Sequence, residues 1–218
     1  MEMDYDVAIC GAGPCGATTG YYLARLGQEN NRPLRVALLD KATFPRDKFC
    51  GDAWCAPALD ILEDMGVLQE LEARGVVCQT LAGGFVSPSG HSFIANDRGT
   101  SNKNMSTRAY AIKRMICDDA IAKKARDIGC DLIENFCVED VILNESKGVW
   151  TVHAIDGKRI TCKILVAADG AASNLARKLG IVLDAPDGVA ARQYIKAGTH
   201  NFKADGVLLY PEYTLPGK

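Results

Sequence analysis

Three glycines near the start of the chain have the spacing of a phosphate-binding turn. Gly11, Gly13 and Gly16 directly follow the short apolar run 7–10 and open a stretch, from about 14 to 26, with the character of a helix. This spacing lets a backbone leave a strand tightly, approach a pyrophosphate closely and pack the next helix against a sheet. The N-terminus of that helix would direct its backbone N–H groups at the phosphates. The alternative is a glycine turn in an unrelated α/β unit that binds no ligand.

An acidic residue completes the pattern. Asp40 ends a second apolar run, 34–39, and the polar loop 28–33 accounts for the slightly long spacing from Gly16. A carboxylate at this place can accept both hydroxyls of an adenosine ribose and would repel a 2′-phosphate. The first nucleotide site therefore favours FAD or NAD over NADP.

A second carboxylate follows a second buried strand. The apolar run 164–168 ends in Asp169 and Gly170, and a helix through Arg177 follows. An apolar strand that ends in Asp-Gly before a helix repeats the geometry of the first turn. We therefore expect Asp169 to approach the same cofactor.

The loop 41–52 and the helix start at 114 add charged and nucleophilic groups. Arg46, Lys48 and Cys50 lie in a loop that leaves the carboxyl end of the second strand, so it can return over the cofactor. The alternative is a solvated basic loop. Arg114 lies in the first turn of a helix, where the dipole disfavours a cation. Either an external anion or an ion pair with Asp118 explains an arginine at this position.

These residues need a scaffold that brings strand ends together, and the hydrophobic pattern predicts one. Helices are expected over 58–73, interrupted near Gly66, and over 113–128, and a β-meander is expected to run into the buried strand 164–168. The expected strands are 81–86, 92–95, 136–143, 149–155, 158–162, 190–197 and 206–210.

Composition excludes several classes of protein. The 218 residues carry a net charge of −2, which gives no reason to expect nucleic acid as a partner. Nine scattered cysteines indicate a cytoplasmic or other reducing compartment, and Cys50 with Cys55 lacks the further ligands of a zinc site. The sequence shows neither a signal peptide nor a membrane-spanning segment.

With these elements in place, the sequence resembles the FAD-dependent aromatic hydroxylases and geranylgeranyl reductases. The glycine motif with Asp40, the Arg114-x-x-x-Asp118 helix start and the motif Ala168-Asp169-Gly170-Ala-Ala-Ser173 with Arg177 carry the resemblance. The loop 44–52 and the ending Leu215-Pro216-Gly217 are similar to the reductase branch. Cys117 stands where the family usually has phenylalanine, and the family's later Gly-Asp motif is absent. We therefore interpret the chain as the N-terminal part of a longer flavoprotein.

The resemblance implies an α/β fold with a Rossmann-like FAD-binding domain, a β-meander and parts of a substrate-domain sheet. The FAD-binding domain would comprise 1–75 and 108–180, and the substrate domain would comprise 76–107 and the incomplete 181–218. Asp40 would bind ribose, Arg114 would reach the phosphates, the Val138 backbone would meet adenine, and Arg46, Lys48 and Cys50 would border the isoalloxazine ring. The implied FAD-binding residues are Gly11, Gly13, Pro14, Cys15, Gly16, Asp40, Lys41, Arg46, Lys48, Cys50, Gly51, Arg114, Val138, Asp169 and Gly170.

The resemblance leaves three functions open. The leading hypothesis is reduction of prenyl double bonds by reduced FAD, with NAD(P)H as external donor and Cys50 either as proton donor or as an inert packed thiol. The alternatives are hydroxylation of an aromatic substrate and an FAD-binding module without turnover. An isoprenoid substrate would imply loose contact with a membrane surface, although no basic amphipathic anchor is visible.

Overall fold

The chain divides into two compact units. The computed structural model describes residues 3–80, 82–87, 89–96, 109–184, 188, 191–194 and 206–209. One unit, the N-terminal unit, comprises 1–48 and 114–190, and the other, the inserted unit, comprises 49–113 and 191–218. The chain therefore passes between the units at 48, 113 and 190.

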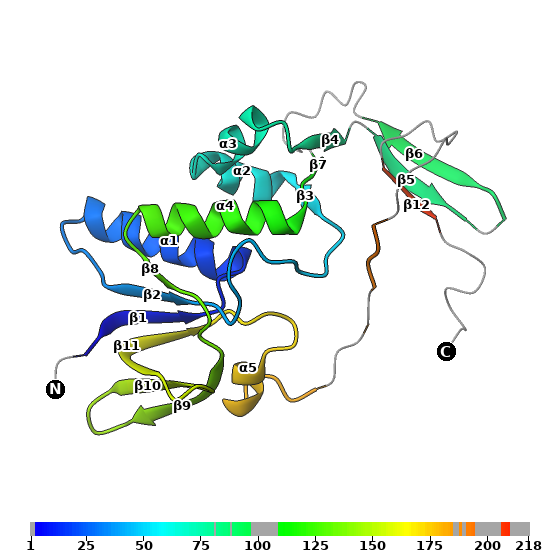
Figure 1. Cartoon of the computed structure of the whole chain (residues 1–218). Helices are drawn as coiled ribbons and strands as arrows, with labels where there is room; N and C mark the ends of the chain where they lie inside the picture. The colour runs from blue at the N-terminus through cyan, green and yellow to red at the C-terminus, as the bar shows by residue number, and fades with distance from the viewer. Residues whose placement is uncertain are drawn as a thin grey trace. The chain divides into compact units, whose positions relative to one another are not determined.

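A six-stranded sheet forms the centre of the N-terminal unit (Figure 1). In spatial order the strands are β8 (Asp131–Ile133), β2 (Val36–Leu39), β1 (Tyr5–Cys10), β11 (Arg159–Ala167), β10 (Val149–Ala154) and β9 (Val138–Asn144). β1 pairs in parallel with β2 and β11, and β2 pairs in parallel with β8, whereas β9, β10 and β11 form an antiparallel meander. The fully buried, apolar β2 is typical of a strand covered on both faces.

Two helices lie side by side along the parallel part of this sheet (Figure 1). α1 (Pro14–Glu29) packs closely because its glycines leave room for neighbours: a Cβ at Gly20 would lie 3.5 Å from Ile9 of β1. α4 (Arg114–Asp127) buries Ile121 and several small residues. A separate buried cluster joins the strands to the short helix α5 (Asn174–Lys178) and comprises Ala8, Cys10, Ala37, Leu39, Phe136, Val152, Ala154, Cys162 and Leu175.

The inserted unit combines two small sheets with two short helices. β7 (Ala109–Ala111) pairs antiparallel with both β3 (Ala53–Cys55) and β4 (Cys78–Thr80). In the other sheet, β5 (Ala82–Val86) lies between β6 (Ser92–Asn96) and β12 (Gly206–Leu209). α2 (Ala56–Asp64) and α3 (Val67–Ala73) bury Leu59, Leu62, Leu68 and Leu71.

The structure confirms the predicted α/β class and most of the expected elements. The helical stretch 58–73 is divided at Gly66, whose φ of +72° is easily adopted only without a side chain. Two expected strands, 158–162 and 164–168, are one continuous strand, β11, because its first half pairs with β10 up to Cys162 and its second half pairs with β1 from Cys162 onward.

Other expectations differ from the structure at short or peripheral segments. Within the expected strand 190–197, the described residues 191–194 form no strand, and the remainder lies outside the described residues. The sequence pattern missed β3, β4, β7 and β8, each of three residues, since so short a segment shows no hydrophobic period. The assignment of segments to FAD-binding and substrate domains stays a prediction.

Among the described residues, no helix has the length and apolar character needed to cross a membrane.

Candidate functional site

The parallel strands of the N-terminal unit bring the predicted site residues to one edge of the sheet. Backbone bonds tie the residues just after the strands together: Gly11 N donates to Leu39 O at 2.8 Å, and Ala168 N donates to Cys10 O at 2.9 Å. Asp40 N likewise donates to Ile133 O at 3.1 Å. The glycine turn, Asp40 and Asp169 therefore meet at the carboxyl ends of the strands, which is where open α/β sheets bind ligands.

Two of the three motif glycines cannot carry a side chain. Gly11 has a φ of +107°, and a Cβ there would lie 2.3 Å from the carbonyl oxygen of Ala168. A Cβ at Gly16 would lie 1.8 Å from the carbonyl oxygen of Gly11. These contacts explain the spacing of the motif, because the turn folds back on its own backbone.

Gly13 differs, since its surroundings leave room for a Cβ atom. A Cβ at Gly13 would meet only Arg46 Nη2, at 3.6 Å, which is an ordinary contact. Gly13 is the N-cap of α1, Pro14 follows it, and the first turn of α1 carries no acidic residue. An anion such as a pyrophosphate fits this half-buried, positively polarised helix start.

The Asp40 carboxylate is buried and accepts several hydrogen bonds. Oδ2 accepts from Ala12 N at 3.1 Å and from Arg46 Nη2 at 3.1 Å, and Oδ1 accepts from Ala42 N at 3.0 Å. Arg46 Nε lies 3.3 Å from Oδ1 and 3.2 Å from Oδ2. The Asp40 side chain is only 6% exposed.

Arg46 extends this contact into a buried network of four charges. Its Nη1 donates to Asp118 Oδ2 at 3.1 Å. Arg114 binds the same fully buried carboxylate through Nε at 2.6 Å and Nη2 at 2.9 Å. The ion pair between Arg114 and Asp118 within α4 is thus confirmed. The network Asp40, Arg46, Asp118 and Arg114, called the four-charge network below, is electrically neutral.

The neighbouring loop is held by residues that the sequence pattern did not single out. Glu134 Oε1 accepts from Phe44 N at 2.7 Å, and Thr43 bonds to Asn135 at 3.2 Å. The Arg46 guanidinium lies 4.7 Å above the Phe44 ring. The sequence pattern gave no signal for Glu134, because it follows β8, a three-residue strand that shows no hydrophobic period.

Asp169 holds the start of α5. Its Oδ1 accepts from Ser173 Oγ, and its Oδ2 accepts from Leu175 N at 3.3 Å. Ser173 caps the helix by accepting from Ala176 N at 2.9 Å. Gly170 has a φ of +91°, and a Cβ there would lie 3.9 Å from Lys48 Nζ. Lys48 therefore lies beside this second turn.

The remaining predicted residues lie on several segments. Lys41 is exposed on the turn after β2, and Cys15 is exposed in the first turn of α1. Val138 begins β9 opposite Ala154 of β10. Cys50 and Gly51 belong to the inserted unit, and Cys50 is half-buried.

Three buried thiols of the N-terminal unit lack the ionisation that thiol chemistry needs. Burial raises the pKa of Cys10 and of Cys117 to about 12, and it raises the pKa of Cys130 to about 11. A thiol is nucleophilic only as its thiolate, so these three side chains are packing groups at neutral pH.

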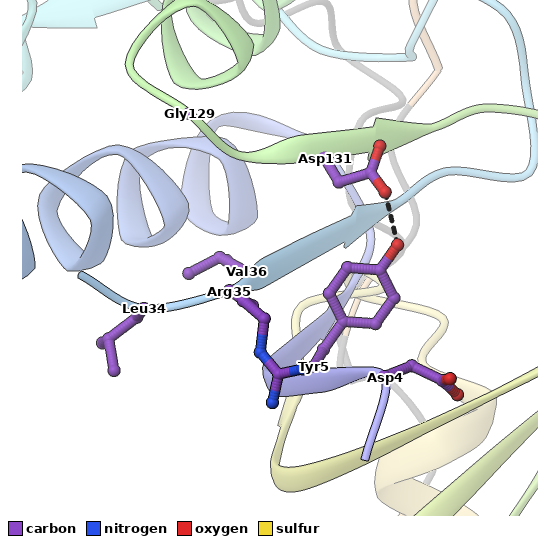
Figure 2. Close-up of a pocket in the computed structure, with 7 residues that line it drawn as sticks. All are labelled: Asp4, Tyr5, Leu34, Arg35, Val36, Gly129 and Asp131. Carbon is purple, nitrogen blue, oxygen red and sulfur yellow. Dashed lines mark hydrogen bonds between the residues drawn. The ribbon is translucent and has the colours of Figure 1, made fainter. Parts of the chain in front are cut away.

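A hollow of about 470 Å³ lies at the opposite, amino ends of the strands (Figure 2). There the Tyr5 hydroxyl donates to Asp131, and burial together with this carboxylate raises the pKa of Tyr5 to about 12. Figure 2 shows these two side chains joined across the hollow, and Arg35 beside them pairs with Asp6. None of the predicted cofactor-binding residues lines it.

The fold and the residues at the carboxyl ends of the parallel strands together define a Rossmann-like dinucleotide-binding protein. The crystal structure of a flavoprotein/dehydrogenase from Cytophaga hutchinsonii has the same fold, with a TM-score of 0.67 and 24% identity over 85% of this chain and 44% of that one. The flavin-dependent brominase Bmp2 matches with a TM-score of 0.65 and 25% identity, covering 81% of this chain and 40% of its own.

The chain belongs to the FAD binding domain family, which matches residues 4–206. FAD is accordingly the cofactor that the glycine turn fits. Conditioned medium factor receptor 1 of Dictyostelium discoideum is 45% identical over 99% of this chain and 43% of its own length. Menaquinone reductase of Mycobacterium tuberculosis is 32% identical over 80% and 40%. Digeranylgeranylglycerophospholipid reductase of Methanococcus aeolicus is 26% identical over 83% and 42%. The chain thus spans less than half the length of these relatives.

Proposed function

We propose that this chain is the cofactor-binding part of an FAD-dependent oxidoreductase that reduces carbon–carbon double bonds of isoprenoid chains. The observation that carries the cofactor assignment is the convergence of the glycine turn, Asp40 and Asp169 at one sheet edge. The substrate class rests on the relatives, because menaquinone and digeranylgeranylglycerophospholipid both contain isoprenoid chains. An isoprenoid lipid would bring the protein to a membrane surface, which is part of the proposal.

Each site residue has a role in this proposal. Backbone N–H groups at the start of α1 would bind the pyrophosphate, and Asp40 would accept the ribose hydroxyls. The ion pair with Asp40 supports placing Arg46 at the nucleotide end of FAD rather than beside the isoalloxazine ring. Lys48, beside Gly170, is suited to the second turn, where Asp169 would face the pyrophosphate or ribityl chain.

The flavin supplies the hydride when it is bound and reduced, and the protein supplies position and a proton. Cys50 is the proposed proton donor, and NAD(P)H is the proposed external electron donor. The alternative is hydroxylation of an aromatic substrate. The glycine turn, Asp40 and Asp169 would serve either reaction, so only the substrate assay separates them.

A visible absorption spectrum tests the cofactor assignment. Purified chain is mixed with FAD, the excess is removed, and the retained flavin is measured. A retained, protein-perturbed flavin spectrum is expected. A folded protein that retains no FAD would refute the proposal for this chain.

The assay for chemistry uses the flavin-loaded chain with NADH or NADPH and either a prenyl or an aromatic substrate. Loss of prenyl double bonds under anaerobic conditions is expected; oxygen-dependent hydroxylation would instead establish the alternative. Flavin without either turnover would mean that this chain is a binding module.

A cysteine pair tests the proton donor. Cys50→Ala should reduce turnover by about 100-fold while FAD is retained, because a positioned acid contributes about that much. Cys55→Ala, which removes an exposed thiol of the same unit, is the matched control and should retain full turnover. Equal activity of both variants would remove Cys50 from the mechanism.

A further inference from the structure

The Asp40 carboxylate has no acceptor capacity left for a ligand. An ionised carboxylate offers about four lone-pair positions. Four N–H groups occupy them: those of Ala12 and Ala42 from the backbone, and Nε and Nη2 of Arg46. Two ribose hydroxyls would each need to donate to the same two oxygens.

Of these four donors, only the two from Arg46 can leave without a change in the backbone. Ala12 N belongs to the glycine turn, and Ala42 N is two residues from Asp40 in the chain, so both are fixed by the backbone. Arg46 contributes through its side chain, which keeps a second carboxylate partner in Asp118 at 3.1 Å. The guanidinium can therefore withdraw from Asp40 and remain paired.

From this geometry we propose that Arg46 is an internal competitor of the adenosine ribose, and that nucleotide binding displaces it from Asp40 while Asp118 retains it. The inference rests on the proposed role of Asp40 in FAD binding. It adds to that role an autoinhibitory contact, in which the protein satisfies its own ribose acceptor until a ribose replaces the arginine.

Competition of this kind lowers the apparent affinity for the ribose, because only the molecules in which Arg46 has left Asp40 can bind it. Removing the competitor should therefore strengthen binding through the ribose alone. The effect must be measured on a ligand without phosphate, because Arg46 also lies close to the phosphate turn, 3.6 Å from a Cβ position at Gly13. Adenosine meets this requirement.

The test compares adenosine with 2′,3′-dideoxyadenosine, which lacks both ribose hydroxyls, by titration of the 218-residue chain. Arg46→Met should bind adenosine about tenfold more tightly than the wild type does, a factor typical of the coupling between two sites. It should bind the dideoxy analogue with unchanged affinity. Arg25→Met, which removes an arginine paired with Glu29 on the exposed face of α1, is the matched control and should change neither affinity. Equal or weaker adenosine binding by Arg46→Met would overturn the inference.

A measurement on the wild type keeps the inference testable if Arg46→Met fails to fold. The Nε–H resonance of Arg46 is assigned from its loss in Arg46→Lys. Adenosine at saturation should shift this resonance and speed its exchange with water, whereas the dideoxy analogue should leave its exchange rate unchanged. An exchange rate that adenosine leaves unchanged would contradict displacement.

The two proposals fail differently. If neither wild type nor Arg46→Met retains FAD, the proposed function is wrong. If the wild type retains FAD and adenosine affinity is the same with and without Arg46, only the internal competition is wrong.

Discussion

At the scale of single residues, removal of the Asp118 carboxylate should strongly lower the free energy of unfolding. Its side chain is fully buried in α4 and pairs with Arg46 and Arg114, which are 15% and 14% exposed. The loss of one partner of a buried ion pair leaves an uncompensated charge, which costs more than the pair itself contributes.

Asp118→Ala should therefore lower the free energy of unfolding by about 3 kcal/mol. Urea denaturation of the apo chain measures it. Glu29→Ala, which removes an exposed partner of Arg25 on α1, is the control and should cost less than about 0.5 kcal/mol. A similar small loss for both variants would mean that the four-charge network contributes little to stability.

The glycine turn allows folding and binding to be separated. Gly16→Ala would place a Cβ 1.8 Å from a backbone oxygen, so we expect a large loss of stability. Gly13→Ala meets only the end of the Arg46 side chain at 3.6 Å, so it should fold normally and retain less FAD, because the added methyl group covers the start of α1. Thermal melting and flavin retention measure the two effects. Normal FAD retention by Gly13→Ala would contradict a pyrophosphate at this turn.

At the scale of elements, the helix that follows the second turn depends on its cap. α5 has only five residues, and Ser173 satisfies the N–H of Ala176 while Asp169 satisfies that of Leu175. A helix this short is stable only through its cap and its packing, here through the buried Leu175.

Ser173→Ala should destabilise the N-terminal unit by about 1 kcal/mol, the usual cost of losing a hydroxyl cap. Chemical denaturation measures it, with Ser146→Ala in the exposed turn 145–148 as control. If the control loses as much stability as Ser173→Ala, the cap is not what stabilises α5.

At the scale of the whole molecule, buried thiols make the free energy of unfolding depend on pH in the alkaline range. The pKa of Cys10 and of Cys117 rises from 9.0 to about 12, and the pKa of Cys130 and of Cys162 rises from 9.0 to about 11, in each case chiefly through burial. Above pH 9 the unfolded chain releases these protons while the folded chain keeps them. The unfolded state is thereby favoured as the pH rises.

The free energy of unfolding should therefore fall steadily between about pH 9 and 12, by at most about 1.4 kcal/mol per pH unit for each thiol. Urea denaturation at intervals across this range measures the slope. Cys117→Ala should make the slope shallower, although it also lowers stability at neutral pH by creating a cavity. A free energy of unfolding that stays constant from pH 8 to 11 would contradict the raised pKa values.

The alternation of strands, helices and glycine turns by itself determined the fold class and the carboxyl-edge site of this protein. Hydrophobic period and turn chemistry are local properties, so β1, α1, β2 and the Asp169 turn could be predicted from the sequence. Because parallel strands place their carboxyl ends at one edge, the meeting of the glycine turn, Asp40 and Asp169 was also predictable.

The helical spacing already allowed the pair of Arg114 with Asp118, but only the tertiary structure decided the partners of Arg46. Arg46 lies in a loop without a repeating pattern. Whether its guanidinium faces solvent, a flavin or Asp40 depends on how that loop packs against Glu134 and Asn135. The short strands β3, β4, β7 and β8 likewise form because partners already lie beside them. Contacts between segments far apart in the chain are set by packing and by the pairing of buried polar groups, which no local pattern records.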